Sequence, residues 1–375
     1  MILYSLVVLL LALLPVAMFV KNGGDFRRAS SDAELLELAT LKRVSILIPA
    51  RNEAASIGPA LEAILSNDHP SFEVLVMDDN SEDETASLVR EYAARDSRVR
   101  LLTSNDLPSG WNGKQHACWQ LANQSQYEWL LFLDADVRLS KDAVSRCVAE
   151  QMRRQAPLIS GFPMQETGTL AEKILIPLMH YVLLGYLPID RMRSSLGVGL
   201  AAGCGQLFFA DKRVYMSIDG HSSIRGSRHD GIQLPRAFRQ AGHRTDIFDA
   251  SDVACCRMYT STTQVCSGLL KNATEGIANA RLILPFTILL IGGSVLPVVS
   301  LVWAYFASTS SIALTMLAVA FAISFWPRLI ACMRFNQPYL GAALHPFGVA
   351  WFISLQWLAM LRKQLGVTTK WRGRS

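Results

Sequence analysis

Apolar residues in this sequence are concentrated in four long stretches near its two ends. Each approaches the roughly 20 residues that a helix needs to cross a bilayer, and they cover about 1–20, 282–306, 311–326 and 343–361. Because 51% of the 375 residues are hydrophobic and cluster in this way, we predict membrane helices at both ends. The chain then divides into an anchor (1–20), a juxtamembrane linker (21–42), a central domain (43–275), a C-terminal transmembrane region (282–361) and a basic tail (362–375).

Basic residues follow the first apolar stretch, with Lys21, Arg27 and Arg28 close behind it. Since cytoplasmic flanks of membrane segments carry an excess of Lys and Arg, we expect a multi-pass protein of the cell (inner) membrane with a cytoplasmic central domain. Three further crossings would leave the basic residues at 370–374 outside, which the same rule opposes. One apolar segment is therefore expected to be re-entrant or interfacial.

Apolar runs alternate with helix-like segments in the central domain. Predicted strands cover 44–48, 74–77, 99–103 and 129–133, and predicted helices cover 54–66, 81–94 and 113–124. Ser81 and Glu84 have the spacing of a capping box at the start of the second helix. This alternation predicts an α/β fold with a mostly parallel sheet, in which ligands bind beyond the carboxyl ends of the strands.

Acidic residues stand at those strand ends. Asp134 and Asp136 follow the last predicted strand, and Glu53, Asp78 and Asp79 follow the first two. Buried carboxylates are costly unless they are paired or bound to a metal. A divalent cation that bridges a phosphorylated ligand would explain two of them at one strand end, whereas a solvated acidic turn is the simpler alternative. We predict Mg²⁺ or Mn²⁺ as the cofactor, held by Asp134 and Asp136.

Several common kinds of site are missing from the sequence. The first predicted strand is followed by neither a Gly-x-Gly-x-x-Gly loop nor a Walker A motif, which disfavours dinucleotide dehydrogenases and P-loop kinases. The central region has no long basic run interleaved with aromatic residues, so we expect no nucleic-acid partner. The seven cysteines form no C-x-x-C pair, which argues against a disulfide framework or a zinc site.

Two later segments have more than one interpretation. The apolar run 170–187 contains Pro177 and fits either an interfacial helix or a buried one. The run Gly203-Cys204-Gly205-Gln206 indicates either close backbone approach to a ligand or a tight turn. After a polar loop, Asp230 begins a helix that we expect Asp230 to cap and Gly242 to close.

Five motifs occur in a characteristic order. They are Pro49-Ala50-Arg51-Asn52-Glu53, Asp78-Asp79-Asn80-Ser81, Gly113-Lys114, Asp134-Ala135-Asp136 and Asp230-Gly231-Ile232-Gln233-Leu234. Together they resemble the family 2 glycosyltransferases of the GT-A fold over roughly 43–245. The membrane-anchored layout and the motif Gly110-Trp111-Asn112-Gly113-Lys114 look most similar to bacterial enzymes that glycosylate lipids, including the hopanoid-associated, carotenoid-type and ceramide glucosyltransferase-like branches.

The resemblance implies a nucleotide-diphospho-sugar donor, with a UDP-sugar favoured, and assigns residues to it. Asp134 and Asp136 match the metal-binding motif, and Lys114 would lie near the uracil or the phosphates. The donor-binding set is Pro49, Arg51, Glu53, Asp78, Asp79, Lys114, Asp134, Arg257 and Lys271. Arg257 and Lys271 would add positive charge at the diphosphate, although Lys271 fits a membrane flank equally well.

The same resemblance makes Asp230 the catalytic base. The family more often has Glu-Asp at this point, whereas this chain has His229-Asp230, so the base is retained and the first position departs from the pattern. The Gln-x-x-Arg-Trp motif of processive synthases is absent, which implies transfer of a single sugar. Direct displacement by the acceptor oxygen inverts the anomeric centre, and the apolar segments favour a membrane lipid with a hydroxyl group as the acceptor.

Two alternatives remain open at this point. The acceptor could instead be a polyprenyl phosphate, which hardly needs a general base, so the effect of Asp230→Asn separates the two acceptors. The chain could instead be a non-catalytic membrane protein that binds nucleotide sugars. The intact set of carboxylates argues against this second alternative.

Overall fold

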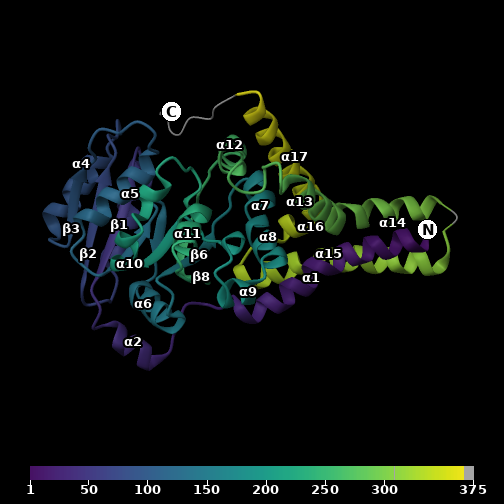
Figure 1. Cartoon of the computed structure of the whole chain (residues 1–375), viewed down its shortest axis with the longest axis horizontal. Coiled ribbons are helices and arrows are strands. Elements are labelled where there is room, and N and C mark those ends of the chain that lie inside the picture. The colour runs from purple at the N-terminus through teal and green to yellow at the C-terminus, as the bar shows by residue number, and fades with distance from the viewer. Residues whose placement is uncertain (308, 367–375) are drawn as a thin grey trace.

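The computed structural model describes residues 1–307 and 309–366, and it separates into an α/β domain and a projecting helical arm (Figure 1). The arm consists of α1 (Ile2–Asp25), α14 (Leu296–Phe306) and α15 (Ser311–Phe335), which run side by side away from the sheet. The predicted fold class, an α/β domain with apolar helices at both ends, is confirmed by this arrangement.

Eight strands form one sheet in the order β3-β2-β1-β4-β7-β6-β8-β5. Neighbours among the first four are parallel, whereas β7 is antiparallel to both β4 and β6, and β5 is antiparallel to β8. The strands are β1 (Val44–Ala50), β2 (Phe72–Asp78), β3 (Val99–Thr103), β4 (Trp129–Leu133), β5 (Val137–Leu139), β6 (Leu158–Gln165), β7 (Leu207–Asp211) and β8 (Thr245–Cys256).

The expectation of a mostly parallel sheet therefore holds only for the half made of β1 to β4. The other half is mixed, and its strands β6 and β8 were not recognisable in the sequence. β6 contains Gly161 and Pro163, and β8 contains three aspartates, so neither has the apolar pattern of a strand. Their parallel pairing with each other is a long-range contact that local sequence does not specify.

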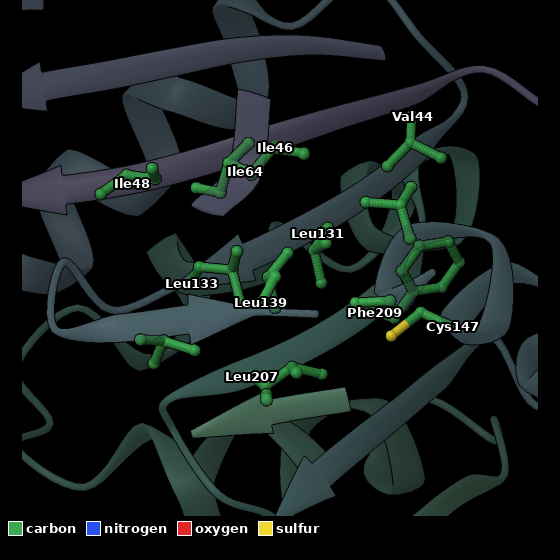
Figure 2. Packing of buried hydrophobic residues seen from close by; sticks show 14 of the residues in the cluster. Val44, Ile46, Ile48, Ile64, Leu131, Leu133, Leu139, Cys147, Leu207 and Phe209 are labelled. Carbon is green, nitrogen blue, oxygen red and sulfur yellow. The ribbon is translucent and has the colours of Figure 1, made fainter. Parts of the chain in front are cut away.

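Helices cover both faces of the sheet. Alternate β1 residues Val44, Ile46 and Ile48 point into a core formed with α3 (Ala54–Leu65) and α6 (Ala143–Arg154), shown in Figure 2. The intervening Leu47 packs on the other face against α5 (Gly113–Gln124) and α11 (Asp230–Gln240). Because successive side chains of a strand face opposite sides and both sides are buried, β1 is an unbroken apolar run.

The loops after β1 and β2 are joined to each other. The N–H of Asn52 donates to Ser81 Oγ at 3.0 Å, and the N–H of Ala54 donates to Asp83 Oδ2 at 3.1 Å. The predicted capping box of Ser81 and Glu84 is therefore wrong, and the helix α4 (Thr85–Arg95) begins four residues after Ser81. Ser81 instead bonds the first loop, which fixes the two carboxyl strand ends relative to each other.

Three helices among the described residues are long and apolar enough to cross a membrane, namely Ile2–Asp25, Ile283–Phe306 and Ser311–Phe335. The second consists of α13 (Ile283–Leu290), the π-helical turn η3 (Ile291–Val295) and α14. A Cβ at Gly293 in this turn would lie 2.8 Å from the carbonyl oxygen of Leu11, so glycine permits close packing on α1. The fourth predicted stretch forms α17 (His345–Gln364), which does not meet the same criteria.

Shorter helices fill the region between the sheet and the arm. The run 170–187 is broken at Pro177 into α7 (Leu170–Leu175) and α8 (Leu178–Tyr186), which contact α17 and α1, respectively. The remaining elements are α9 (Ile189–Ser194), η1 (Val198–Leu200), α10 (Lys212–Ser217), η2 (Gly220–Ile224), α12 (Thr262–Ala273) and α16 (Tyr339–Ala343). Most residues of α7 and α8 are buried or half-buried within the protein.

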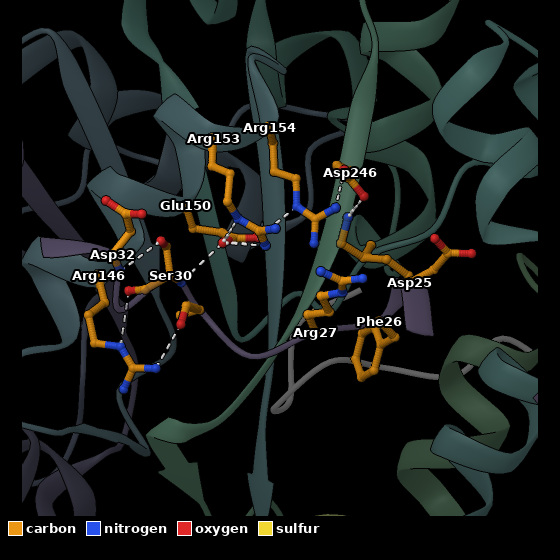
Figure 3. A network of polar contacts seen from close by, with 12 residues as sticks. Asp25, Phe26, Arg27, Ser30, Asp32, Arg146, Glu150, Arg153, Arg154 and Asp246 are labelled. Atoms are coloured by element: carbon orange, nitrogen blue, oxygen red, sulfur yellow. Dashed lines mark hydrogen bonds and ion pairs between the residues drawn. The ribbon is translucent and has the colours of Figure 1, made fainter. Parts of the chain in front are cut away.

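The helix α2 covers Ala33–Ala39. The linker that joins α1 to α2 lies against the α/β domain and is part of the polar network shown in Figure 3. Arg28 forms a β-bridge with Asp249 of β8, and the N–H of Ser30 donates to Glu150 Oε2 at 3.1 Å. At the base of the arm, Arg334 Nε of α15 lies 3.7 Å from Asp249 Oδ2 of β8. These contacts attach the arm to the domain at several points.

Candidate active site

Lys114 is the centre of a cluster of charged side chains at the carboxyl edge of the sheet. It is the second residue of α5, and its N–H donates to the capping side chain of Asn112 at 3.1 Å. Its Nζ lies 2.6 Å from Asp134 Oδ1 and 2.9 Å from Asp230 Oδ2, and it donates to the Gly205 carbonyl at 3.1 Å. Since an ammonium group has three protons, these acceptors occupy its full donor capacity.

Gly205 allows these elements to meet. Antiparallel pairing of β4 with β7 brings the two strand ends together, and the N–H of Asp134 donates to the carbonyl of Gln206 at 3.1 Å. A Cβ at Gly205 would lie 2.2 Å from Asp230 Oδ1, so a larger residue would displace that carboxylate. The close approach that the glycines suggested is thus an approach to the Asp230 side chain.

The charged cluster lines a narrow hollow. Pro49 of β1 contributes to its wall together with Lys114, Asp134, Gly205 and Asp230. The hollow contains no space of the size of a water molecule. A ligand can therefore reach the inner oxygens of Asp134 and Asp230 only if Lys114 or a neighbouring side chain moves.

Asp136 lies two residues after Asp134, where β5 pairs with the end of β8. Burial raises the pKa of Asp136 to about 6, and the nearby charge of Asp134 adds to this effect. Burial also raises the pKa of Asp134, although Lys114 opposes the rise. Asp136 Oδ1 is buried and has no hydrogen-bond partner among the described residues.

These two carboxylates fit a divalent cation. A cation would supply a partner for Asp136 Oδ1 and favour the ionised forms that burial disfavours. Within the described parts of the chain, no group of three or more His, Cys, Asp or Glu side chains is arranged to hold a metal alone. One or two carboxylates are nevertheless sufficient where ligand phosphates and water complete the coordination of Mg²⁺. Binding of Mg²⁺ or Mn²⁺ by Asp134 and Asp136 stays a prediction.

Asp230 is the first residue of α11, and His229 occupies the N-cap position. The prediction that Asp230 caps this helix is therefore wrong, because its carboxylate turns towards the Lys114 ammonium, a stronger partner than a backbone N–H. Burial alone would raise the pKa of Asp230, but Lys114 outweighs it and the pKa is lowered to about 2. Gly242, at φ +86°, closes the helix as predicted.

The predicted donor-binding residues at the ends of β1 and β2 lie in the two joined loops. Arg51 is buried and donates from Nη1 to the carbonyl of Asp79 at 2.8 Å. Asp78 is buried at the end of β2, and the N–H of Glu53 donates to Thr85 Oγ1 at 2.8 Å. The structure thus brings these residues to one edge of the sheet, and their contact with a nucleotide stays a prediction.

Arg257 and Lys271, which we expect to face the diphosphate, lie in different surroundings. Arg257 Nε is 3.2 Å from Glu172 Oε2 at the start of α7, so Arg257 is engaged in an ion pair with Glu172. Burial lowers the pKa of Lys271 to about 8 and the charge of Lys114 adds to this, whereas Asp230 and Asp134 oppose it. Lys271 therefore lies within the electric field of the charged cluster.

Comparison with known proteins relates the central domain to one family of enzymes. The sequence profile of Glycosyl transferase family 2 matches residues 45–212, the segment that contains β1 to β4, Lys114 and the Asp134-Ala135-Asp136 motif. The central domain is therefore similar to glycosyl transferase family 2 over residues 45–212. The mixed α/β sheet with its acidic carboxyl edge is the GT-A-like fold that the sequence motifs implied.

Curated relatives of this chain include two that are 28% identical to it. The 4,4'-diaponeurosporenoate glycosyltransferase of Staphylococcus haemolyticus (strain JCSC1435) matches over 222 residues, or 59% of this chain and 58% of the relative. The 4,4'-diaponeurosporenoate glycosyltransferase of Staphylococcus aureus (strain USA300) matches over 253 residues, or 64% of this chain and 63% of the relative. The chain thus spans about three fifths of the length of these relatives.

Solved structures with a similar chain trace include a mannosyltransferase, PcManGT, from Pyrobaculum calidifontis in complex with GDP-Man and Mn²⁺. It is 16% identical, has a TM-score of 0.49, and the match covers 94% of this chain and 99% of that chain. The S. aureus protein TarS (residues 1–349) in complex with UDP is 16% identical with a TM-score of 0.40, over 88% of this chain and 93% of that chain.

Some residues around the candidate site were not predicted. The Gln206 side chain donates to Cys256 Sγ at 2.7 Å, and Cys256 is also in contact with Asp136. His221 Nδ1 lies 2.8 Å from the hydroxyl oxygen of Tyr215, and burial lowers the pKa of His221 to about 3. Of these residues, Gln206 alone followed a recognisable signal, the preceding glycines, because the others approach the site from distant elements.

If Lys271 contacts the donor as predicted, its lowered pKa should make donor binding dependent on pH. Lys271 is protonated below about pH 8 and loses its charge above it, so attraction for a diphosphate should decline as the pH rises through 8. We expect the affinity for a UDP-sugar, measured by calorimetry at fixed Mg²⁺, to weaken several-fold by about pH 9.

Lys271→Met should bind the donor more weakly at neutral pH and lose this alkaline decline. Lys212→Met provides a matched control, because Lys212 Nζ donates to the Ser125 carbonyl on another part of the domain. An alkaline decline of the same size in Lys271→Met would show that another group is responsible.

Proposed function

We propose that this chain is an inverting glycosyltransferase that moves one sugar from a nucleotide-diphospho-sugar, preferably a UDP-sugar, to a hydroxyl of a membrane lipid. The observation that carries the proposal is the cluster in which Lys114 joins Asp134 and Asp230 beside the unsatisfied oxygen of Asp136. This cluster combines a pair of carboxylates suited to a cation with a third carboxylate that can accept a proton. The attached arm of three apolar helices supports a membrane acceptor.

The proposed reaction is a single displacement. The acceptor oxygen forms a bond to the anomeric carbon while the bond between that carbon and the diphosphate oxygen breaks, and the hydroxyl proton passes to Asp230. A cation held by Asp134 and Asp136 would supply Lewis-acid stabilisation of the leaving diphosphate. Lys271 would add positive charge at the diphosphate, and Arg257 would do so after leaving Glu172.

The ion pair between Lys114 and Asp230 affects this mechanism. While Lys114 binds Asp230, the pKa of that carboxyl is about 2, which makes Asp230 a weak proton acceptor. We infer that Lys114 moves from Asp230 towards the donor phosphates during binding, which frees Asp230 and raises its basicity. This movement also opens the narrow hollow that the side chains close.

The acceptor is proposed to be an apolar lipid of the carotenoid type or a related membrane lipid. Relatives named 4,4'-diaponeurosporenoate glycosyltransferase support this class, as do the apolar helices at both ends of the chain. The domain would face the cytoplasm, because Lys21, Arg27, Arg28 and Arg334 lie at the domain end of the arm. The described residues at its other end, Ala307, Thr309 and Ser310, include no Lys or Arg.

Release of nucleoside diphosphate tests the proposed function. The purified full chain, reconstituted in lipid vesicles with Mg²⁺ or Mn²⁺, should release UDP from a UDP-sugar only when an apolar hydroxylated lipid is present. Mass spectrometry should show a lipid heavier by one sugar residue. Donor binding without UDP release or glycolipid under any acceptor tested would instead support a non-catalytic binding protein.

A further inference from the structure

The helix α17 carries a row of exposed apolar side chains along one face. We call this row the α17 stripe, and it consists of Phe347, Trp351, Leu358, Leu361 and Leu365. Phe347, Leu358, Leu361 and Leu365 are 57%, 39%, 50% and 78% exposed, and Trp351 is half-buried. The spacing of three, four or seven residues places all five on one side of a helix.

The opposite face of α17 is already occupied by protein. Val349, Ile353 and Ala359 are buried there, and Trp357 Nε1 donates to Thr287 Oγ1 of α13 at 3.0 Å. The helix also contacts α7, α12 and η3. The α17 stripe is therefore the face that remains after α17 has packed on the rest of the molecule.

The sequence and direction of α17 distinguish it from the helices of the arm. With 20 residues it is about 30 Å long, yet it is not among the helices apolar enough to cross a membrane. It also buries the polar side chains of His345 and Gln356. In Figure 1, α17 starts near the base of the arm and runs steeply across the direction of α1, α14 and α15.

The exposed surface next to the α17 stripe is apolar as well. Leu284 and Ile288 of α13, which flank Thr287, are 57% and 54% exposed. They belong to one of the helices long enough to span a bilayer. A bilayer crossed by the arm has its plane across the arm axis, so a helix that runs across that axis at its base lies along the membrane surface.

We propose that α17 is an interfacial helix that rests in the domain-side leaflet of the bilayer with the α17 stripe towards the acyl chains. Arg362 and Lys363, exposed at its C-terminal end, then lie at the level of the headgroups, where basic side chains are favoured. The chain crosses the membrane three times, which returns residues 362–375 to the side of the α/β domain. The basic tail then agrees with the positive-inside rule, and its residues 367–375 lie outside the described part of the chain.

The placement of α17 affects how an acceptor lipid would reach the site, an inference that rests on the proposed function. The placement itself does not depend on the proposed function. The helix α12 packs Val265, Leu269 and Leu270 into the same apolar cluster as Ile353 and Trp357 of α17, and Lys271 near its end acts on the pKa of Asp134. The helix α12 thus connects α17 with the charged cluster. If the proposed function is correct, the acceptor lipid would approach Asp230 from the bilayer past α12.

The depth of single labelled positions in the membrane tests the proposal. Cys255 and Cys266, the two cysteines that are not buried, are first replaced by serine in the full chain. A cysteine at Phe347, Ser354 or Leu361 then carries an environment-sensitive fluorophore in phosphatidylcholine–phosphatidylglycerol vesicles. Lipids with nitroxides at the headgroup and at shallow or deep acyl positions quench it according to depth.

We expect the three positions to have the same shallow depth, because the proposed helix is parallel to the surface. A spanning helix would instead change depth by about 1.5 Å per residue, or about 20 Å between positions 347 and 361. Ile312 and Leu329, exposed on α15, provide the control that should show such a gradient. Asn105 in the α/β domain should show no quenching.

A gradient through the bilayer centre at the α17 positions would overturn the proposal in favour of a fourth crossing. Absence of quenching at all three positions would also overturn it, since the stripe would then face water or another protein. Ser354 is exposed and already polar, so labelling at this position should not disturb folding. The test therefore remains valid even if replacement of Phe347 or Leu361 prevents folding. None of these readings depends on catalysis, so failure of the proposed function would leave them unchanged.

Discussion

Asp136→Asn is expected to abolish detectable turnover and to weaken donor binding together. The asparagine keeps the size of the side chain but removes the charge that would hold a cation next to the diphosphate. Metal ions contribute several kcal/mol of transition-state stabilisation, which corresponds to a loss of about 10²–10³-fold in turnover or more. The variant should also lose affinity for Mn²⁺, which paramagnetic resonance of the free ion measures without any substrate.

Asp106→Asn is the matched control for this prediction, because Asp106 is exposed in the loop after β3 and should change neither quantity. Excess chelator should reduce the wild-type rate to the level of Asp136→Asn. Full activity of the wild type in chelator would contradict the assignment of a metal to Asp134 and Asp136. In that case the raised pKa of Asp136 would reflect only its burial and the neighbouring charge of Asp134.

Asp230→Asn is expected to lower the turnover number by about two to four orders of magnitude, the usual range for loss of a general base. Donor affinity should change little, because the base contacts the acceptor hydroxyl and Lys114 retains Asp134 and the Gly205 carbonyl as partners. Folding should be preserved, since an asparagine oxygen can still accept the Gly231 N–H that Asp230 Oδ1 accepts at 2.9 Å.

The control for this variant is Asp211→Asn, since Asp211 caps α10 by accepting the Val214 N–H and asparagine caps helices about equally well. Its activity should match that of the wild type. If Asp230→Asn instead retains turnover within a few-fold while folded, Asp230 is not the base. A phosphate acceptor, which needs little base catalysis, would then become the better interpretation.

Local sequence determined the first half of the sheet and the acidic edge. The structure confirms the predicted strands 99–103 and 129–133 and the helix 113–124 at the predicted bounds, and it extends the predicted strands 44–48 and 74–77 by a few residues. These elements are recognisable because each is an apolar run or a helical pattern within a few residues. The position of Asp134 and Asp136 at the end of a buried strand follows directly from that pattern.

The partners of the site side chains were decided by tertiary structure. Lys114, Asp134 and Asp230 come from three separate elements, and only the insertion of β7 beside β4 brings Gly205 and Asp230 to the Lys114 ammonium. The same long-range packing turns Asp230 away from its capping position. Arg257 likewise pairs with Glu172 because β8 ends beside α7, a contact between distant parts of the chain.

Hydropathy alone identified the apolar ends of the chain but not the role of each segment. The first three stretches became long helices of one arm, whereas α17, almost as long, packs one face on α7, α12 and α13 and leaves the α17 stripe exposed. Sequence determines how apolar a helix is. Contacts between distant segments decide which face of the helix is covered by protein and in which direction the helix runs relative to the arm. These contacts exist only in the folded chain.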